Sequence, residues 1–240
     1  MDAFAYALYI AVLFVANALQ AITGFAGTAL AMPAVALLVG ADTARVVLNV
    51  VMLVSSAWIA WTSREHLNRP AFCRIVVFML VGMAAGMALY RFVSSDALLR
   101  VYGAAIVVIA LWGLVRGIAT EGELSRAAQA AILFVAGVIQ GAFVSGGALL
   151  VLFAVRVLPS KEEFRATLAP VWVVLGVIMC AEQAWEGAYT PQALGLLALA
   201  VVPVAVAVVV GSRLQRRISQ AHFTTLTFAL LAVSGLVAML

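Results

Sequence analysis

The charged residues of this chain are confined to narrow clusters that separate long stretches without any charge. A helix that crosses a bilayer needs roughly 20 consecutive apolar residues. Eight stretches of 15 or more residues contain no Asp, Glu, Lys or Arg, namely 3–41, 46–63, 75–90, 101–115, 127–155, 166–181, 187–212 and 218–240. Hydrophobic residues make up 66% of the chain and charged residues 10%, against about 25% charged in a soluble domain. The sequence therefore predicts an all-α integral membrane protein surrounded by the lipid bilayer.

Two of the uncharged stretches, 3–41 and 127–155, are too long for one comfortable span. Small and polar residues interrupt both of them, at 23–28 and at 145–147. Dividing the stretches there predicts helices over about 4–22 and 28–40, and over about 128–144 and 148–158. The chain then has ten helical segments, two of them shorter than a normal span. The pattern leaves open whether these short segments cross the membrane or form re-entrant hairpins.

The Lys and Arg residues indicate how these segments are oriented. Cytoplasmic loops of membrane proteins are enriched in Lys and Arg. Either treatment of the short segments places eleven basic residues on one side and three on the other, the three being Arg45, Arg91 and Arg100. We therefore predict that the larger group is cytoplasmic, and that both termini and the loop after residue 181 are extracytoplasmic.

The two halves of the chain, 1–120 and 121–240, match over one ungapped segment at an offset of 120 residues. The matched pairs are Gln20 and Gln140, Gly27 and Gly147, Leu30 and Leu150, Asp42 and Glu162, and Arg45 and Arg165. Each half contains an odd number of predicted segments, five, so the second half enters the membrane from the opposite side. We therefore predict a single integral domain of two inverted-topology repeats, with the short Gly-broken helices at its centre.

The two interruptions lie at equivalent positions in the repeats and are candidates for a substrate site. Where a helix is broken, the N–H groups that begin its second piece carry a partial positive charge, and an anion can satisfy them. Nearby hydroxyl and amide groups add further donors. The predicted substrate-binding residues are Gln20, Thr23, Gly24, Gly27, Thr28, Asn49, Gln140, Ser145, Gly146 and Gly147. The alternative is that small residues only let helices pack closely, which is our interpretation of Gly82 and Gly86.

Three charged residues near the predicted helix ends have two interpretations each. Arg45 and Arg165 either guide anions into two vestibules or merely extend to the membrane interface. Glu182 either carries a coupled proton or lies in an outer loop, and we favour the loop. The uncharged stretches contain no acid pair, metal-ligand cluster or Ser–His pair, so we expect no metal, no cofactor and no enzymatic activity.

The sequence around the two breaks also resembles that of a known protein family. An apolar helix precedes a Gly-containing break, a short helix with Pro33 follows, and the second half contains a near-copy. The motif residues are Gly24, Ala26, Gly27 and Pro33 in the first half, and Gly146 and Gly147 in the second. Over essentially the whole chain this pattern resembles the TauE/SafE family of sulfite exporter-like permeases, although Ala26 interrupts the first glycine cluster and Phe153 stands where Pro33 would repeat. The resemblance implies a bacterial inner-membrane protein that exports sulfite, organosulfonates or related anions.

Together, these features predict secondary active export of a small sulfur-containing anion, with the two halves moving around the breaks. The alternative is a passive anion channel, or a permease for another small carboxylate or oxyanion. A membrane scaffold that does not transport is a third hypothesis, and it would tolerate filling both glycine breaks. Proton coupling and an oligomeric state are both compatible with the sequence, whereas 14 Lys and Arg residues are too few for a nucleic-acid partner.

Overall fold

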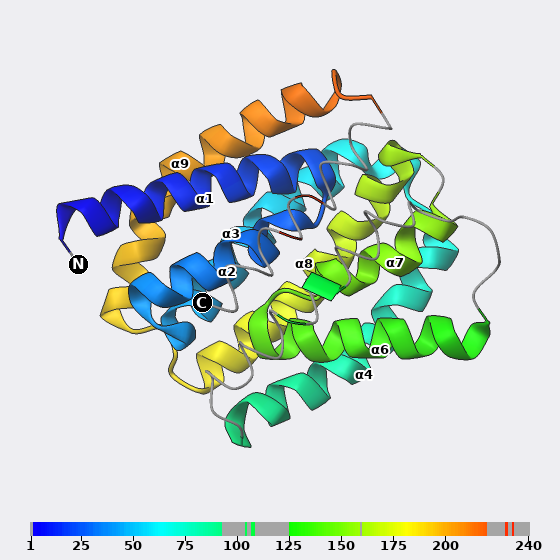
Figure 1. Ribbon diagram of the computed structural model, residues 1–240, viewed down its shortest axis with the longest axis horizontal. Helices are drawn as coiled ribbons and strands as arrows, with labels where there is room; N and C mark the ends of the chain where they lie inside the picture. Colours follow the sequence, from blue (N-terminus) through cyan, green and yellow to red (C-terminus); the bar gives the residue numbers. More distant parts are fainter. Residues whose placement is uncertain are drawn as a thin grey trace.

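Figure 1 shows the computed structural model, a bundle of helices. The structure describes residues 2–92, 104, 107, 108, 125–158, 160–219, 229 and 232. Within these residues it contains eight α-helices and no strand, which confirms the all-α prediction. The predicted fifth segments of the two halves, 101–115 and 218–240, fall almost wholly outside the described residues.

Six of the helices are long and apolar enough to cross a membrane, so the chain is a multi-pass membrane protein. They are α1 (Ala3–Thr23), α3 (Ala41–Ser63), α4 (Arg69–Phe92), α6 (Arg126–Phe143), α8 (Lys161–Trp185) and α9 (Pro191–Gln215). The other two, α2 (Ala26–Val39) and α7 (Gly147–Val157), have 14 and 11 residues and directly follow the predicted breaks. At about 1.5 Å per residue they reach roughly 21 and 16 Å, against about 30 Å of hydrocarbon, so each covers only part of the bilayer.

Polar residues fix where four of these helices begin. The side chains of Asp2, Ser125, Ser160 and Thr190 each accept a hydrogen bond from the backbone N–H three residues further on. Such N-caps satisfy one of the N–H groups that every helix start leaves unpaired. Pro191 follows one cap at the first position of α9, where its missing N–H removes no helical hydrogen bond. Three of these helices therefore begin at the polar clusters that separate the uncharged stretches, and α9 begins just inside the stretch 187–212.

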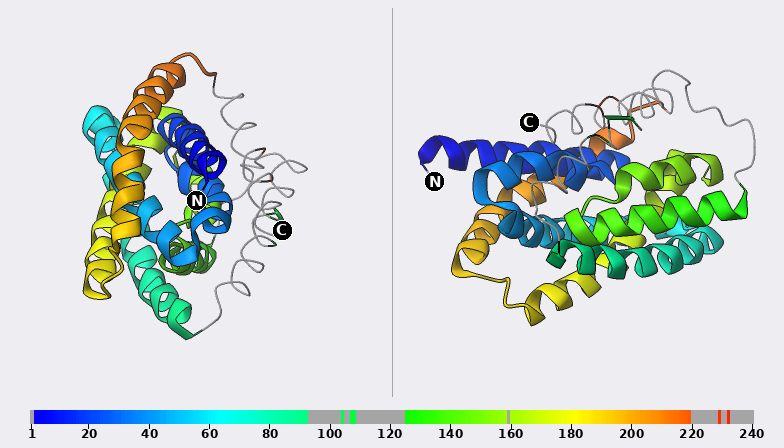
Figure 2. Two further views of the ribbon diagram at one scale, coloured as in Figure 1. Left: turned by 90° about the vertical axis from the view of Figure 1, so that its left-hand side faces the viewer. Right: turned by 60° about the horizontal axis from the view of Figure 1, so that its bottom comes forward.

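A seam of glycines joins α4 of the first half to α6 of the second, and the two helices lie side by side in Figures 1 and 2. A Cβ at Gly82 would overlap the backbone carbonyl oxygen of Phe134. Three more glycines along this seam meet the opposite backbone in the same way: Gly86, Gly137 and Gly141. The two backbones are in direct contact, which confirms the prediction that Gly82 and Gly86 serve packing.

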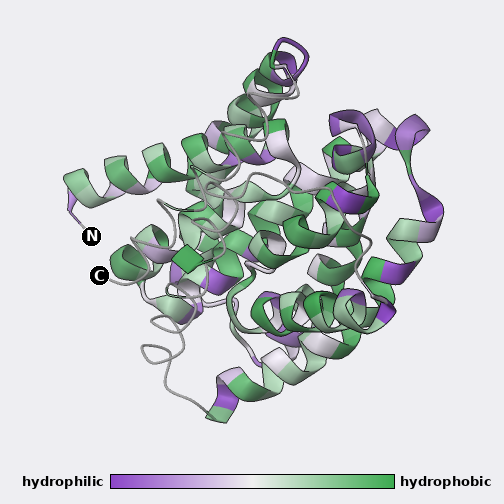
Figure 3. Cartoon of the chain, turned by 45° about the vertical axis from the view of Figure 1, so that its right-hand side comes forward, coloured by the Kyte–Doolittle hydropathy of each residue, from purple (hydrophilic) through white to green (hydrophobic). Residues whose placement is uncertain are grey.

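Apolar side chains cover the outer surface of the bundle as well as its core. Figure 3 shows hydrophobic residues along the helices and hydrophilic residues concentrated near helix ends and loops. Phe92 and Trp185 are 86% and 91% exposed within the protein, and both lie at helix ends. Large aromatic side chains at such positions are typical of the interface between lipid and water. The surface is therefore that of a protein whose helices face lipid.

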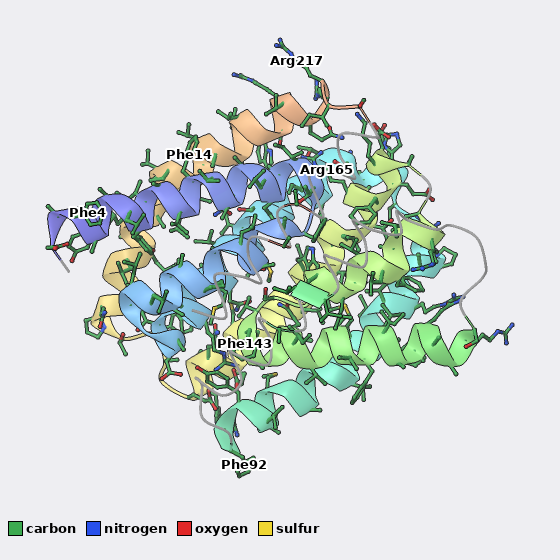
Figure 4. All side chains as sticks on the ribbon, in the orientation of Figure 1. Phe4, Phe14, Phe92, Phe143, Arg165 and Arg217 are labelled. Carbon is green, nitrogen blue, oxygen red and sulfur yellow. The ribbon has the colours of Figure 1, made fainter. Side chains whose placement is uncertain are left out.

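The bundle has two polar ends, which we name after one arginine each. At the Arg165 end the start of α8 meets the last turns of α3 and α9, where Arg165 donates to the hydroxyls of Ser63 and Ser212, both at 3.0 Å. At the Arg45 end the start of α3 meets the last turns of α4 and α8, where Tyr90 donates to Asp42 at 2.9 Å. In Figure 4 the label of Arg165 lies well apart from those of Phe92 and Phe143, which belong to the Arg45 end.

The basic residues separate between these two ends as the charge pattern predicts. Among the residues that the structure describes, only Arg45 and Arg91 lie at the Arg45 end, and the other basic residues lie at or near the Arg165 end. The helix order is compatible with two inverted repeats. The inverted relation and the membrane side of each end remain predictions.

Candidate functional site

The structure brings the two breaks together. The first turns of α2 and α7 touch, and a Cβ added at Gly147 would lie 2.9 Å from the carbonyl oxygen of Phe25. From α8, the indole Nε1 of Trp172 donates to the carbonyl oxygen of Gly24 at 2.8 Å. Broken backbone from both halves and one helix of the second half therefore meet at one place inside the bundle.

In the first break, side chains of α1 satisfy the freed backbone groups. Gly24 ends α1 in the left-handed conformation, with φ of 85°, and its N–H donates to the carbonyl oxygen of Gln20 at 2.7 Å. The hydroxyl oxygen of Thr23 accepts from the N–H of Ala26 at 3.2 Å, and Oε1 of Gln20 accepts from the N–H of Gly27 at 2.8 Å. Thr23 and Gln20 thus cap the short helix that follows.

The second break repeats this solution with a different turn residue. Val144 ends α6 with φ of 56°, and its N–H donates to the carbonyl oxygen of Gln140 at 2.8 Å. Oε1 of Gln140 accepts from the N–H of Gly146 at 3.0 Å. A β-branched residue in the left-handed region is strained, whereas Gly24 adopts it freely. The two predicted glutamines therefore use their oxygens to cap the α2 and α7 starts.

The amide nitrogens of the two glutamines are held more loosely than their oxygens. Nε2 of Gln20 lies 3.4 Å from the hydroxyl of Ser56, and Nε2 of Gln140 lies 4.0 Å from the sulfur of Met52. Both distances are at the long limit for a hydrogen bond of that type. Two amide donors beside the breaks are thus weakly engaged.

The structure corrects the residue pairing between the breaks. A Cβ at Gly27 would meet the Cβ of Gln20 at 2.7 Å and the carbonyl oxygen of Ala16 at 2.9 Å. The same two kinds of contact, to Gln140 and Ala136, surround Gly146 and not Gly147. The ungapped match of Gly27 to Gly147 is therefore wrong as a structural equivalence, because the second break is one residue shorter at this point.

The remaining predicted residues divide between two places. Thr28 and Gln20 line a small cavity of about 10 Å³ beside Gly27, which is room for about one water molecule. Asn17 also lines it, a buried amide in the middle of an apolar helix that the sequence interpretation missed. Asn49 is not on this cavity, because its amide nitrogen donates toward Gly176, Cys180 and Gln183 of α8. Ser145 is fully buried in the second break.

A second cavity, which we call the basic cavity, opens at the Arg165 end and has a volume of about 290 Å³. Cationic and hydroxyl side chains from three separate chain segments surround it. Its lining residues are Thr62, Ser63, His66, Lys161, Glu162, Arg165, Gln215 and Arg216. The sequence interpretation identified Arg165 alone among them, since residues from α3, α8 and α9 come together only in the fold. A larger groove of about 470 Å³ between α3 and α9 is lined almost entirely by Val, Ala and Leu, which offer an anion no donors.

Both predicted vestibule arginines are buried, Arg45 to 6% and Arg165 to 8% exposure. Arg45 donates from Nη2 to the carbonyl oxygen of Gly141 at 2.9 Å, and its guanidinium carbon lies 3.7 Å from the centre of the Tyr90 ring. Each arginine thus contacts a segment of the other half close to its break, since Arg165 packs on Gly24. Both side chains therefore pack inside the bundle, and the guidance of anions by either arginine stays a prediction.

Glu182 is not in a loop, so the location that we favoured for it is wrong. It lies in the last turn of α8, its side chain is 12% exposed, and its Oε1 is 3.5 Å from Nη2 of Arg91. Within the described part of the chain, no group of three or more His, Cys, Asp or Glu side chains could hold a metal ion. Besides Glu182, the polar features described so far are the two breaks, the two buried arginines and the basic cavity.

Comparison with known proteins agrees with this arrangement. The family model for the sulfite exporter TauE/SafE matches residues 9–238, nearly the whole chain. No curated protein and no solved structure gave a significant match. The family match spans both breaks, both buried arginines and the six long apolar helices. By its sequence and its helical membrane fold, the chain belongs to the TauE/SafE family of sulfite exporters.

Proposed function

We propose that this protein exports a small sulfur-containing oxyanion, such as sulfite or an organosulfonate, as a secondary transporter of the bacterial inner membrane. Family membership supports the substrate class, and one observation supports the route. Arg165 lines the basic cavity, while its Cα would lie 3.2 Å from a Cβ at Gly24. A single residue therefore connects a cationic cavity with the first break.

The chemistry of the basic cavity suits an oxyanion. Its residues include Lys161, Arg165 and Arg216 against one carboxylate, Glu162, whose Oε1 lies 3.7 Å from Nζ of Lys161. The exposed His66 places the cavity at the surface. Cations that line a concave surface concentrate anions there. Ser63 and Ser212 hold the two terminal nitrogens of Arg165, and its buried Nε has no partner within the described residues. A guanidinium fixed in this way presents a charge-assisted donor to sulfite oxygens.

Passage beyond Arg165 requires movement of the halves. The cavity at the first break holds about one water molecule, which is too small for sulfite. The weakly held Nε2 groups of Gln20 and Gln140, with the hydroxyl of Thr28, are the donors that we assign to an anion at the breaks. Rocking of the two repeats would open this space toward one side at a time, as in other inverted-repeat transporters.

The charge distribution supports an orientation in which the basic cavity faces the cytoplasm, where an exported anion would enter. The Arg165 end, with most of the basic residues, is assigned to the cytoplasm, and both termini to the outside. A reporter fused to the N-terminus should therefore be active only on the extracytoplasmic side. A cytoplasmic signal from that fusion would overturn the orientation.

Sulfite efflux from reconstituted liposomes tests the proposed route. Arg165→Gln removes the charge and its charge-assisted hydrogen bonds, which are each worth about 1.5–3 kcal/mol. We expect apparent sulfite affinity from the Arg165 side to fall about tenfold or more. Arg213→Gln is the matched control, because Arg213 is exposed on α9 and does not line the cavity. Equal transport by the two variants would contradict the route through the basic cavity.

The same liposomes separate coupled export from passive permeation. A proton-coupled transporter loses uphill sulfite movement when the pH gradient is collapsed. Unchanged flux after the collapse would end the hypothesis of proton coupling. Flux that saturates for carboxylates but not for sulfite or sulfonates would favour the alternative substrate class.

A further inference from the structure

Buried polar atoms without partners concentrate at the Arg45 end. Within the described residues, five buried side-chain N or O atoms have no hydrogen-bond partner. Four of them belong to one cluster, in Arg45, Asn49, Glu182 and Gln183. Buried polar groups in proteins are almost always paired, so these atoms need partners from outside the described residues, either a ligand or ordered water. The fifth, Nε of Arg165, already belongs to the basic cavity.

Helix geometry and one direct contact hold the cluster together. Arg45 lies one turn before Asn49 on α3, and Glu182 precedes Gln183 on α8. The amide nitrogen of Asn49 donates to Oε1 of Gln183 at 3.1 Å, which ties α3 to α8. The charges of Glu186, Arg45 and Arg91 all act on the carboxylate of Glu182. Asn49 is 0% and Gln183 2% exposed, so neither side chain can obtain its missing partner from bulk water.

The unpaired atoms include both donors and acceptors. Nε of Arg45 and Nε2 of Gln183 are donors, and a bound oxyanion would satisfy both. Oδ1 of Asn49 and Oε2 of Glu182 are acceptors. Neither atom can hydrogen-bond to a deprotonated oxyanion, because both partners would then be acceptors. The carboxylate of Glu182 and an anion would therefore compete for the same positive field.

We infer that Arg45 and Gln183 form a second oxyanion-binding site on the transport route, which we call the second station, and that the carboxylate of Glu182 displaces the anion from this site. This inference rests on the proposed export of a sulfur oxyanion. When the station is empty, Glu182 neutralises the field of Arg45 and Arg91. When the anion arrives, it takes the donors of Arg45 and Gln183, and repulsion from Glu182 keeps its residence short. At the predicted exit side, such a station favours release.

The other interpretation is an ion-pair network that only fastens α4 to α8. Arg91 pairs with Glu186 as well as with Glu182, and Glu186 is the more exposed, at 33% against 12%. Glu186 is therefore a matched control: it carries the same charge, lies one turn further on and pairs with the same arginine. A purely structural network would respond to loss of either carboxylate without any gain in anion affinity.

The test is equilibrium binding of sulfite to the full-length protein in nanodiscs at one fixed pH, with efflux measured in parallel. Glu182→Gln should bind sulfite about tenfold more tightly, because a like charge is removed, and should release it more slowly. Gln183→Leu should bind about tenfold more weakly, because a donor is lost. Glu186→Gln, which removes the same charge from a carboxylate outside the cluster, should shift the affinity much less than Glu182→Gln.

The two opposite shifts protect the test from folding defects, since a misfolded variant cannot gain affinity. If Glu182→Gln does not fold, the weakening by Gln183→Leu relative to Glu186→Gln decides the result. Unchanged affinity in both Glu182→Gln and Gln183→Leu, with normal sulfite efflux by the unmodified protein, would overturn the second station alone. Absence of sulfite binding and efflux in the unmodified protein would overturn the proposed function, and this inference with it.

Discussion

The two breaks reach the same backbone arrangement with different residues. In each, a glutamine one turn before the turn residue caps the next helix, at 2.8 Å in the first break and 3.0 Å in the second. Glycine makes the turn in the first and valine in the second, and Thr23 adds a second cap to the first break. The glutamine cap therefore holds the backbone geometry of each break, while the turn residue determines how much backbone strain that geometry causes.

The surroundings of the breaks differ more than their backbones do. Arg165, packed on the first break, opens into the basic cavity between hydroxyl groups. Arg45, bonded to the helix before the second break, lies under the Tyr90 ring and within the field of carboxylates. The Arg165 side therefore presents cationic groups to an open cavity, whereas at the Arg45 side nearby carboxylates shield the positive charge.

Filling the contact between the breaks should have the largest effect. Gly147→Leu would drive a side chain into Phe25, and Gly27→Leu would drive one into Gln20. We expect both variants to insert into the membrane and to lose sulfite efflux completely. Gly195→Leu is the control, because a Cβ there meets nothing within 4 Å. Normal efflux by both break variants would show that the breaks are not part of the route.

Removing the caps should have an intermediate effect and tests whether the breaks are equivalent. Gln20→Leu and Gln140→Leu each leave a buried N–H without its acceptor, which costs about 1–3 kcal/mol. Thermal unfolding in detergent should show a loss of that size for each. Gln20→Leu keeps the Thr23 cap on the N–H of Ala26, so we expect it to be the less damaging of the two. The reverse order would mean that the threonine does not support the first break.

Exchanging the turn residues should have the smallest effect. A non-glycine residue in the left-handed region costs about 1–2 kcal/mol, and Val144→Gly would relieve that strain while removing a fully buried side chain. Burying a Val side chain contributes about 1.5–3 kcal/mol, so we expect Val144→Gly to lower the stability of the protein by about 1 kcal/mol. Gly24→Val should also destabilise the protein, because of the positive φ and because its Cβ would lie 3.2 Å from the Cα of Arg165. A gain of stability in Val144→Gly would show that the backbone strain costs more than the packing of the valine contributes.

The sequence predicts the parts of this fold that depend on charge and on local breaks. Uncharged stretches mark the six long helices, the interruptions at 23–28 and 145–147 mark where α2 and α7 begin, and Gly82 and Gly86 mark a helix contact. A shift of one residue within the second break was not predictable, because Gly146 and Gly147 are adjacent and only their environments distinguish them.

The polar surroundings of the breaks depend on tertiary contacts and were harder to predict. The glutamines were predicted as donors, yet their oxygens meet backbone N–H groups, a contact that depends on the path of the chain after the turn. Glu182 was placed in a loop because it lies beyond the uncharged stretch, whereas α8 continues for a full turn past the end of that stretch. The basic cavity was missed because its residues are far apart in sequence.

The glycine seam between α4 and α6 restricts how the two halves can move. Its backbones touch with no side chain between them, so no layer of flexible atoms exists there that could compress or slide. Gly211 of α9 makes the same kind of contact with α1, since a Cβ there would overlap the carbonyl oxygen of Ala18. In the proposed transport cycle, the helices of each such pair would therefore move together, and the rearrangement of the halves would occur where side chains separate the helices.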